Sequence, residues 1–87
     1  MSEENPSSQR TLEREITRSY GLLLTQRQLA ELLGRTVGGL RYSLSRPPDA
    51  RTSRIRDCAR RIGRRVYYPA SEIAAIIAGP ADDRAPR

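Results

Sequence analysis

Arginine gives this sequence its most distinctive chemistry. All 16 basic residues are Arg and none is Lys, and with 10 acidic residues the formal net charge is +6. Each guanidinium group presents a planar fork of donors that fits phosphate oxygens and the edges of guanine bases. The high pI of about 10.7 therefore predicts a polyanionic partner, and nucleic acid or an anionic membrane surface fits best.

One arginine cluster surrounds Gly63, in a stretch with no acidic residue between Asp57 and Glu72. Like charges on a narrow turn repel one another, and a phosphate backbone or a narrow minor groove would relieve that repulsion. A turn that is merely solvated usually carries some acid. We therefore expect this turn to be a DNA-contacting wing, and its arginines are Arg60, Arg61, Arg64 and Arg65.

A second group of donors falls on the segment 35–46. Once its apolar residues are assigned to the interior, the side chains that remain carry guanidinium and hydroxyl groups and no acid. We expect Arg41 and Tyr42 to contact base edges or the groove, whereas Thr36, Ser43 and Arg46 are expected to hold phosphates. The predicted recognition set is Arg35, Thr36, Gly39, Arg41, Tyr42, Ser43 and Arg46, and the predicted additional phosphate contacts are Thr25, Gln26, Arg27 and Tyr67.

The elements that must position these donors follow from the apolar spacing. Residues 11–20 and 70–78 each place apolar side chains three or four residues apart, which predicts two amphipathic helices. The apolar positions are Leu12, Ile16 and Tyr20 in the first and Ile73, Ile76 and Ile77 in the last. We expect the last helix to end at Gly79 and to pack on the helix pair that lies between them in the sequence.

That helix pair has the spacing of a helix-turn-helix. Thr25 and Gln28 form a capping box that begins the first helix after a short apolar run, Gly34 ends it in the left-handed conformation, and Thr36 caps the second. Small Ala30 leaves room for the helices to cross, so that the second can project into a major groove. The inward positions are Leu29, Leu33, Val37, Leu40 and Leu44. An ordinary helical hairpin without a ligand is the alternative.

Two glycines interrupt the second helix of this pair. Gly38 and Gly39 cost up to about 1 kcal/mol each in a helix interior. Close approach of the backbone to DNA, or a helix that starts later, would each account for them.

The segments that follow are expected to be a loop and a hairpin. Residues 49–56 show no apolar period and are expected to run as a surface loop. Ile62 before the glycine turn and Val66 after it predict a short β-hairpin whose second strand ends at Pro69. Tyr67 and Tyr68 alternate across that strand, so we expect one to lie in the core and the other to be able to contact sugar or phosphate. The sequence leaves open which of them is buried.

Composition excludes several classes of site. Cys58 is the single cysteine and there is no histidine, so we expect no metal site, no cofactor and no enzymatic activity. The apolar runs are far shorter than the roughly 20 residues that cross a bilayer, and no signal-peptide core is evident at the start. We expect a cytoplasmic protein without a membrane partner, with flexible segments at 1–10 and 79–87 around one folded domain at 11–78.

The stretches LLTQRQLAELLGRTVGGLRYSL and RRIGRRVYYPASEIAAIIAG, within 22–79, resemble the small MerR-like winged helix-turn-helix proteins of mobile elements, which include phage excisionases and AlpA-type regulators. The resemblance implies a mostly α fold with a small β-hairpin. It also implies sequence-specific binding to double-stranded DNA by a recombination directionality factor, which binds tandem sites cooperatively and bends DNA. The implied partners are further copies on DNA and a site-specific recombinase (integrase). A transcriptional regulator at a promoter operator and a small protein-interaction module are the alternatives.

Overall fold

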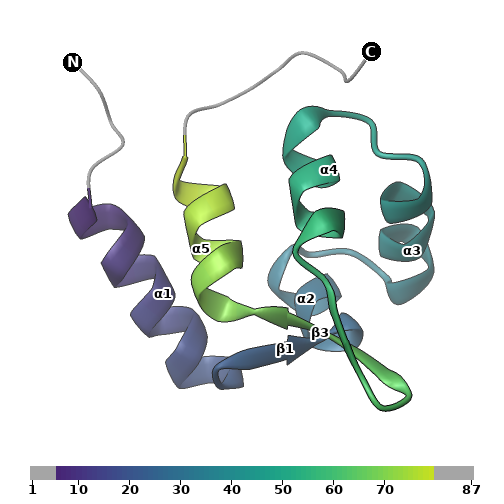
Figure 1. Ribbon diagram of the computed structural model, residues 1–87. Coiled ribbons are helices and arrows are strands. Elements are labelled where there is room, and N and C mark those ends of the chain that lie inside the picture. The colour runs from purple at the N-terminus through teal and green to yellow at the C-terminus, as the bar shows by residue number, and fades with distance from the viewer. Residues whose placement is uncertain (1–5, 80–87) are drawn as a thin grey trace.

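The computed structural model describes residues 6–79, which form five helices and one three-stranded antiparallel sheet (Figure 1). This part of the chain is therefore mostly helical, with a small sheet, as the sequence predicts. The elements in chain order are α1 (Pro6–Tyr20), β1 (Leu23–Thr25), α2 (Gln26–Leu32), α3 (Val37–Ser45), α4 (Ala50–Asp57), β2 (Arg60–Ile62), β3 (Arg65–Pro69) and α5 (Ala70–Ala78).

The sheet joins the predicted hairpin to a strand that the sequence analysis did not predict. Its strand order is β1-β3-β2, so β3 lies in the centre and pairs with both neighbours. Leu24 of β1 pairs with Tyr68 of β3, and both side chains are buried. Because this pairing joins residues far apart in the sequence, the apolar run before Thr25 could not reveal it through local periodicity. The strand places the start of α2 beside the hairpin.

One apolar core fills the space between the helices and the sheet. Every helix contributes to it, and the largest fully buried side chains are Leu24, Leu29 and Ile73. Complete burial of each such side chain stabilises the fold by about 1.5–3 kcal/mol. Tyr68 is buried and Tyr67 is half-buried, which settles the question left open by the sequence. The hairpin strand β2 adds nothing to the core, because all its residues are exposed.

The last helix packs elsewhere than predicted. α5 lies mainly against α1 and also contacts α4 and β3, instead of packing on the α2–α3 pair. Figure 1 shows α5 between α1 and α4. The cause is connectivity: β3 leads directly into α5, and β3 pairs with β1, which follows α1. The chain therefore enters α5 beside α1.

The segment expected to be a loop at 49–56 is a helix instead. The carboxylate of Asp49 accepts a hydrogen bond from the backbone N–H of Thr52 at 2.7 Å and caps α4. That backbone hydrogen bond, with one from the Thr52 side chain, holds the pKa of Asp49 below its ordinary value. Ile55 is the one buried residue within α4, so the helix lacks the apolar stripe that would have predicted it.

The first helix begins at Pro6, five residues before the expected start. Proline suits the first turn of a helix because its missing N–H would have no partner there. Residues 6–10 of the predicted flexible segment at 1–10 are thus part of α1, and residues 1–5 lie outside the described part of the chain. The tail predicted at 79–87 also lies outside it except for Gly79, whose carbonyl accepts a hydrogen bond from Arg51 at 3.1 Å.

Candidate nucleic-acid interface

An open groove of about 450 Å³ separates the tip of the β2–β3 hairpin from the start of α2 and the exposed side of α3. The side chains around it carry guanidinium, hydroxyl, amide and methyl groups but no carboxylate. They are Thr25, Gln26, Arg27, Val37, Arg41, Arg64, Arg65 and Val66. Three segments that are separate in the sequence thus place four arginines around one concave, positively charged surface.

The turn between α2 and α3 is fixed by short-range hydrogen bonds. The predicted capping box is confirmed, with Thr25 Oγ1 accepting from the backbone N–H of Gln28 at 3.1 Å. Gly34 has φ +70°, and the next N–H, that of Arg35, donates to the carbonyl of Ala30 at 2.8 Å. This pattern ends the helix with a left-handed residue, a conformation that glycine adopts without strain. The direction in which α3 leaves is therefore set locally.

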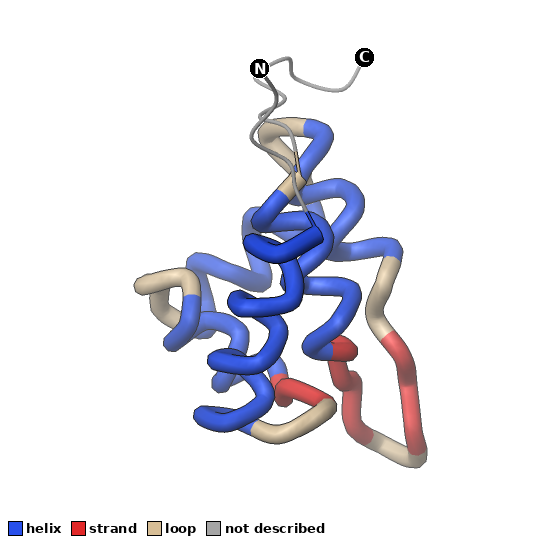
Figure 2. Tube along the Cα trace, turned by 90° about the vertical axis from the view of Figure 1, so that its left-hand side faces the viewer, coloured by secondary structure: helices blue, strands red, loops and turns tan. Residues whose placement is uncertain are grey.

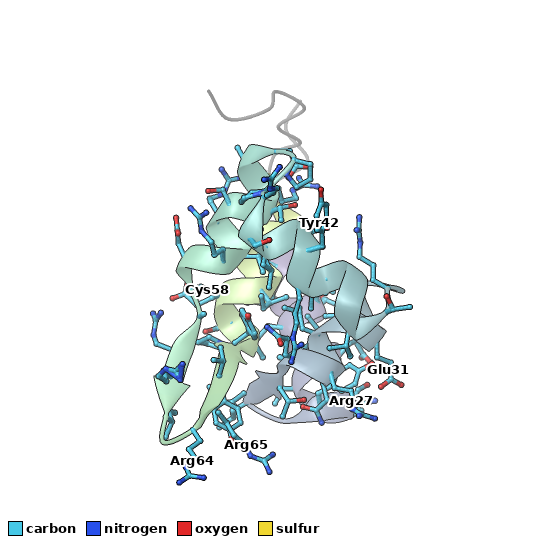
Figure 3. The ribbon with its side chains drawn as sticks, turned by 90° about the vertical axis from the view of Figure 1, so that its right-hand side faces the viewer. Arg27, Glu31, Tyr42, Cys58, Arg64 and Arg65 are labelled. Atoms are coloured by element: carbon cyan, nitrogen blue, oxygen red, sulfur yellow. The ribbon has the colours of Figure 1, made fainter. Side chains whose placement is uncertain are left out.

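The start of α3 is capped by Thr36, also as predicted. Its hydroxyl oxygen accepts a hydrogen bond from the backbone N–H of Gly39 at 2.9 Å. Leu40 and Leu44 are buried and Val37 is half-buried, so one side of α3 faces the core. The opposite side carries exposed residues that include Tyr42, whose exposed fraction is 67%; the residue is labelled in Figure 3.

Of the predicted recognition set, Arg41 alone lines the groove. The others lie on α3, at its caps or directly before it, outside that lining. Arg35 donates a hydrogen bond to the Ser43 hydroxyl at 3.3 Å, which holds that arginine along α3. Except for half-buried Ser43, all members of the set are exposed: Arg35, Thr36, Gly39, Arg41, Tyr42 and Arg46.

The hairpin tip supplies the other side of the groove. Gly63 has φ +65°, which makes the tight turn between Ile62 and Arg65, a cross-strand pair. Arg64 and Arg65 follow directly, and Figure 3 shows both at the end of the hairpin with their guanidinium groups pointing away from the helices. Figure 2 shows the hairpin reaching beyond the helical body.

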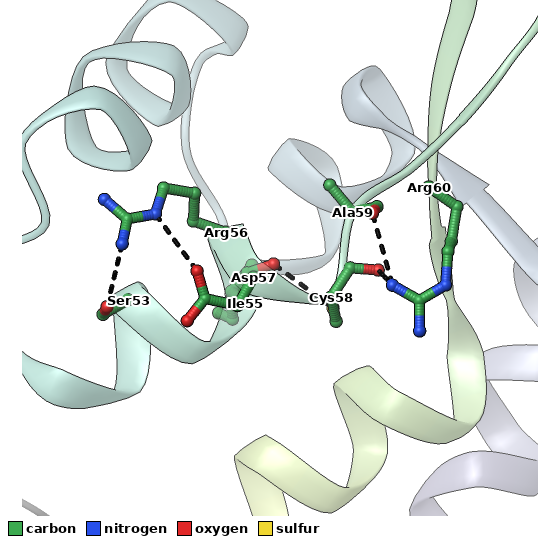
Figure 4. Close-up of polar contacts among 7 residues, drawn as sticks. All are labelled: Ser53, Ile55, Arg56, Asp57, Cys58, Ala59 and Arg60. Carbon is green, nitrogen blue, oxygen red and sulfur yellow. Dashed lines mark hydrogen bonds and ion pairs between the residues drawn. The ribbon is translucent and has the colours of Figure 1, made fainter.

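The other two hairpin arginines do not line the groove. Arg60 folds back toward α4, where its guanidinium donates to the carbonyls of Cys58 at 2.9 Å and Ala59 at 3.3 Å (Figure 4). Arg61 lies opposite Val66 in the hairpin and is exposed. The prediction placed all four arginines together at the wing, whereas the structure uses Arg60 to hold the base of the hairpin.

The groove arginines have no acidic partner among residues 6–79. An exposed ion pair between Arg56 and Asp57, 3.4 Å long (Figure 4), involves no residue that lines the groove. Arg41 donates through Nε to the side-chain oxygen of Gln26 at 3.2 Å, which is a neutral acceptor. The positive charge around the groove is therefore not neutralised within the described part of the chain.

Two additional residues of the groove, Val37 and Val66, were not expected to face a ligand. Val37 was assigned to the interior and Val66 to the hairpin, and each is half-buried. Their methyl groups give the groove apolar contact area between the arginines. No signal in the sequence separates a half-buried valine that borders a groove from one that fills a core.

Comparison of this chain with protein family models, with curated proteins and with solved structures gave no match. The groove itself is therefore the feature from which a function can be proposed. The resemblance to winged helix-turn-helix proteins of mobile elements stays a prediction from the sequence.

Other chemistry is limited in the described region. Burial raises the pKa of the Cys58 thiol to about 11, so the thiol is protonated at neutral pH, and it donates to the carbonyl of Ile55 at 3.2 Å. Between residues 6 and 79, no group of three or more His, Cys, Asp or Glu side chains gathers as metal ligands would. No helix in that range is both long enough and apolar enough to span a membrane.

Proposed function

We propose that this protein binds double-stranded DNA through the groove and the adjoining exposed side of α3. The observation that carries the proposal is the convergence of Arg27, Arg41, Arg64 and Arg65 on one surface without a carboxylate. Bringing like charges together costs free energy unless an anion neutralises them. A phosphate backbone supplies a continuous row of such anions.

In this proposal the fold is a winged helix-turn-helix. α2 and α3 form the helix pair, α3 enters the major groove, and the β2–β3 hairpin is the wing that contacts the neighbouring backbone. The tight turn at Gly34, the Thr36 cap and the exposed Arg41 and Tyr42 support this assignment. An α-helix with its side chains is about 10–12 Å in diameter, so α3, with nine residues, fits a major groove about 12 Å wide.

The biological role that we propose is that of an excisionase-type recombination directionality factor, which binds tandem sites cooperatively and bends DNA. The sequence resemblance over 22–79 supports it. A single small domain makes few contacts, and specific sites require dissociation constants of about 10⁻⁸ M or lower, so several copies should bind side by side. The partners would be further copies of this chain and a site-specific recombinase. Regulation of transcription from a promoter operator is the second candidate.

The salt dependence of binding tests the DNA-binding function. Fluorescence anisotropy with a labelled duplex should show affinity that falls linearly on a log–log plot between about 50 and about 200 mM KCl, with a slope near 0.9 for each neutralised phosphate. If all four groove arginines contact phosphates, the slope is about 3.6 from them alone. Affinity that does not change with salt, or no binding to duplex DNA, would contradict the proposal.

Footprinting on DNA next to the protein's own gene separates the two roles. Several evenly spaced sites, together with a bend measured by gel mobility, support the directionality factor. A single palindromic site without a bend supports the promoter regulator instead.

A further inference from the structure

Two hydrogen bonds connect a buried tyrosine of the sheet to an exposed arginine of α3. The amide nitrogen of Gln26 donates to the hydroxyl of Tyr68 at 3.3 Å. The amide oxygen of Gln26 accepts from Nε of Arg41 at 3.2 Å. Tyr68 is only 2% exposed. The hydrogen-bond network Tyr68–Gln26–Arg41 therefore begins in the core and ends in the groove.

The donors and acceptors of this hydrogen-bond network allow only one orientation of the Gln26 side-chain amide. The guanidinium of Arg41 can only donate, so it requires the oxygen of Gln26. The nitrogen of the same amide then points to Tyr68, whose hydroxyl can accept. Gln26 is the first residue of α2, directly after the Thr25 capping box, so its backbone is held as well. Both ends of the Gln26 side chain are therefore fixed.

The consequence for Arg41 is a guanidinium plane with a set direction. Its Nε is occupied by Gln26, and among the described residues its two terminal nitrogens have no hydrogen-bond partner. A long side chain such as that of Arg loses conformational entropy when it is ordered, which weakens binding. Because Nε of Arg41 is already held in place, part of this entropy is lost on folding and not on binding.

We propose that Arg41 recognises a guanine in the major groove, and that Gln26 and Tyr68 are positioning residues that orient its guanidinium for that contact. This inference rests on the proposed DNA-binding function. Two terminal N–H groups in one plane match the O6 and N7 acceptors of guanine, which are the acceptors that arginine most often recognises. A phosphate contact needs no such fixed plane, because phosphate oxygens accept from many directions.

The test measures whether the affinity for DNA depends on the N7 atom of one guanine in the binding site. Duplexes bound by the wild-type protein are first selected from a random library, and each guanine of the selected site is then replaced in turn by 7-deazaguanine. Wild type should lose about tenfold in affinity at one guanine of each site, the effect of one hydrogen bond from a charged donor. Arg41→Ala should bind more weakly and show no loss at that guanine.

The positioning role is tested with variants that remove no charge. Tyr68→Phe and Gln26→Leu should both reduce the loss at that guanine from tenfold to about threefold or less. Because the Tyr68 side chain is buried and does not line the groove, Tyr68→Phe should also keep the wild-type affinity for unrelated DNA and the wild-type salt slope. Tyr67→Phe is the matched control, because it removes the hydroxyl of the neighbouring residue on the same strand, which is not part of the hydrogen-bond network Tyr68–Gln26–Arg41. It should leave the tenfold loss unchanged. Circular dichroism establishes that each variant is folded.

The outcomes separate the inference from the function on which it rests. A wild-type protein that binds DNA with a steep salt slope but is insensitive to every 7-deazaguanine overturns the guanine contact and leaves the proposed function standing. If Arg41→Ala abolishes the sensitivity while folded Tyr68→Phe and Gln26→Leu both keep it whole, the positioning role is overturned. Absence of binding to duplex DNA overturns both.

Discussion

The groove and the outer side of α1 both carry arginines, but they differ in what accompanies them. Arg10, Arg14 and Arg18 recur every four residues along α1 and border an open hollow of about 530 Å³ that Glu13 also lines. Glu15 lies next to Arg14 in the sequence. On a helix, opposite charges three or four residues apart attract each other. The α1 arginines therefore have carboxylates within one turn. Of the groove arginines, Arg27 has Glu31 one turn later on α2, Arg41, Arg64 and Arg65 have no acid within four residues, and no carboxylate lines the groove.

The number of arginines in a region therefore does not locate an interface. A stripe on one helix can form from i, i+4 spacing alone and balance its own charge. The groove instead needs α2, α3 and the hairpin to converge, and that convergence concentrates unneutralised charge. Figure 1 also shows α1 on the far side of α5 from α3. A duplex on the groove should therefore leave the outer side of α1 uncontacted.

Removing two arginines from the groove should weaken DNA binding far more than removing two arginines from α1. The double variant Arg64→Ala/Arg65→Ala should lose on the order of 50-fold in affinity for duplex DNA at about 0.1 M salt, and its log–log salt slope should fall by about 1.8, because two phosphate contacts are lost. Fluorescence anisotropy measures both quantities.

The matched control is Arg14→Ala/Arg18→Ala, which removes the same charge from α1. It should lose no more than about threefold in affinity, through the lower net charge alone, with little change in slope. Equal losses from the two double variants would show that DNA responds to total charge, and the distinction between groove and α1 would fail.

The second prediction concerns the cap that starts α3. Thr36→Ala removes the acceptor of the Gly39 N–H and should lower the free energy of unfolding by about 1 kcal/mol. Thr11→Ala is the control: Thr11 is exposed within α1, where alanine is the better helix former, so stability should be unchanged or rise by a few tenths of a kcal/mol. Urea denaturation followed by circular dichroism compares the two. Equal changes in both variants would contradict the assignment of Thr36 as a cap.

Local signals predicted those parts of the fold that depend on neighbours in the sequence. Thr25 and Gln28, Gly34, and Thr36 each act within four residues, and the structure confirms their roles. The strand β1 depends on pairing between Leu24 and Tyr68, which no local pattern contains. The helix α4 was missed for a different reason, because its single buried residue, Ile55, gives no periodicity.

The sequence predicted most of the residues that line the groove, but not how the fold brings them together. Six residues that line the groove were expected to contact DNA: Thr25, Gln26, Arg27, Arg41, Arg64 and Arg65. Their convergence depends on the pairing of Thr25 with Tyr67, which brings the start of α2 beside the hairpin. Because that pairing was not predicted, the sequence could not separate Arg64 and Arg65 from Arg60, which holds the hairpin base.

The third prediction sets stability against binding. A Cβ atom added at Gly38 would meet nothing within 4 Å, so Gly38→Ala should stabilise the fold by about 0.5–1 kcal/mol. If α3 lies in a major groove with its first turn close to DNA, the same methyl group should weaken binding severalfold. Ser19→Ala, at an exposed position of α1, should also gain a few tenths of a kcal/mol of stability but keep full affinity. Thermal unfolding and anisotropy together decide this, and a Gly38→Ala protein with unchanged affinity would place the first turn of α3 away from DNA.

The smallest expected effect is a gain of affinity at the edge of the groove. Glu31 is exposed and lies one helical turn after Arg27 on α2, as Figure 3 shows. A carboxylate roughly 10 Å from a phosphate is repelled by about 0.4 kcal/mol in water, so Glu31→Gln should bind duplex DNA about twofold more tightly.

Because salt screens charges at that distance, the gain should be largest at low ionic strength and vanish above about 0.3 M salt. Glu15→Gln makes the same change on α1, where no duplex is expected, and should leave affinity within error of wild type. Titrations of both variants at matched salt give the ratio directly. A duplex in the groove lies nearer to Glu31 than to Glu15, so the two variants should differ in affinity. If Glu15→Gln gains as much affinity as Glu31→Gln, the repulsion depends on net charge alone, and the placement of the duplex in the groove is contradicted.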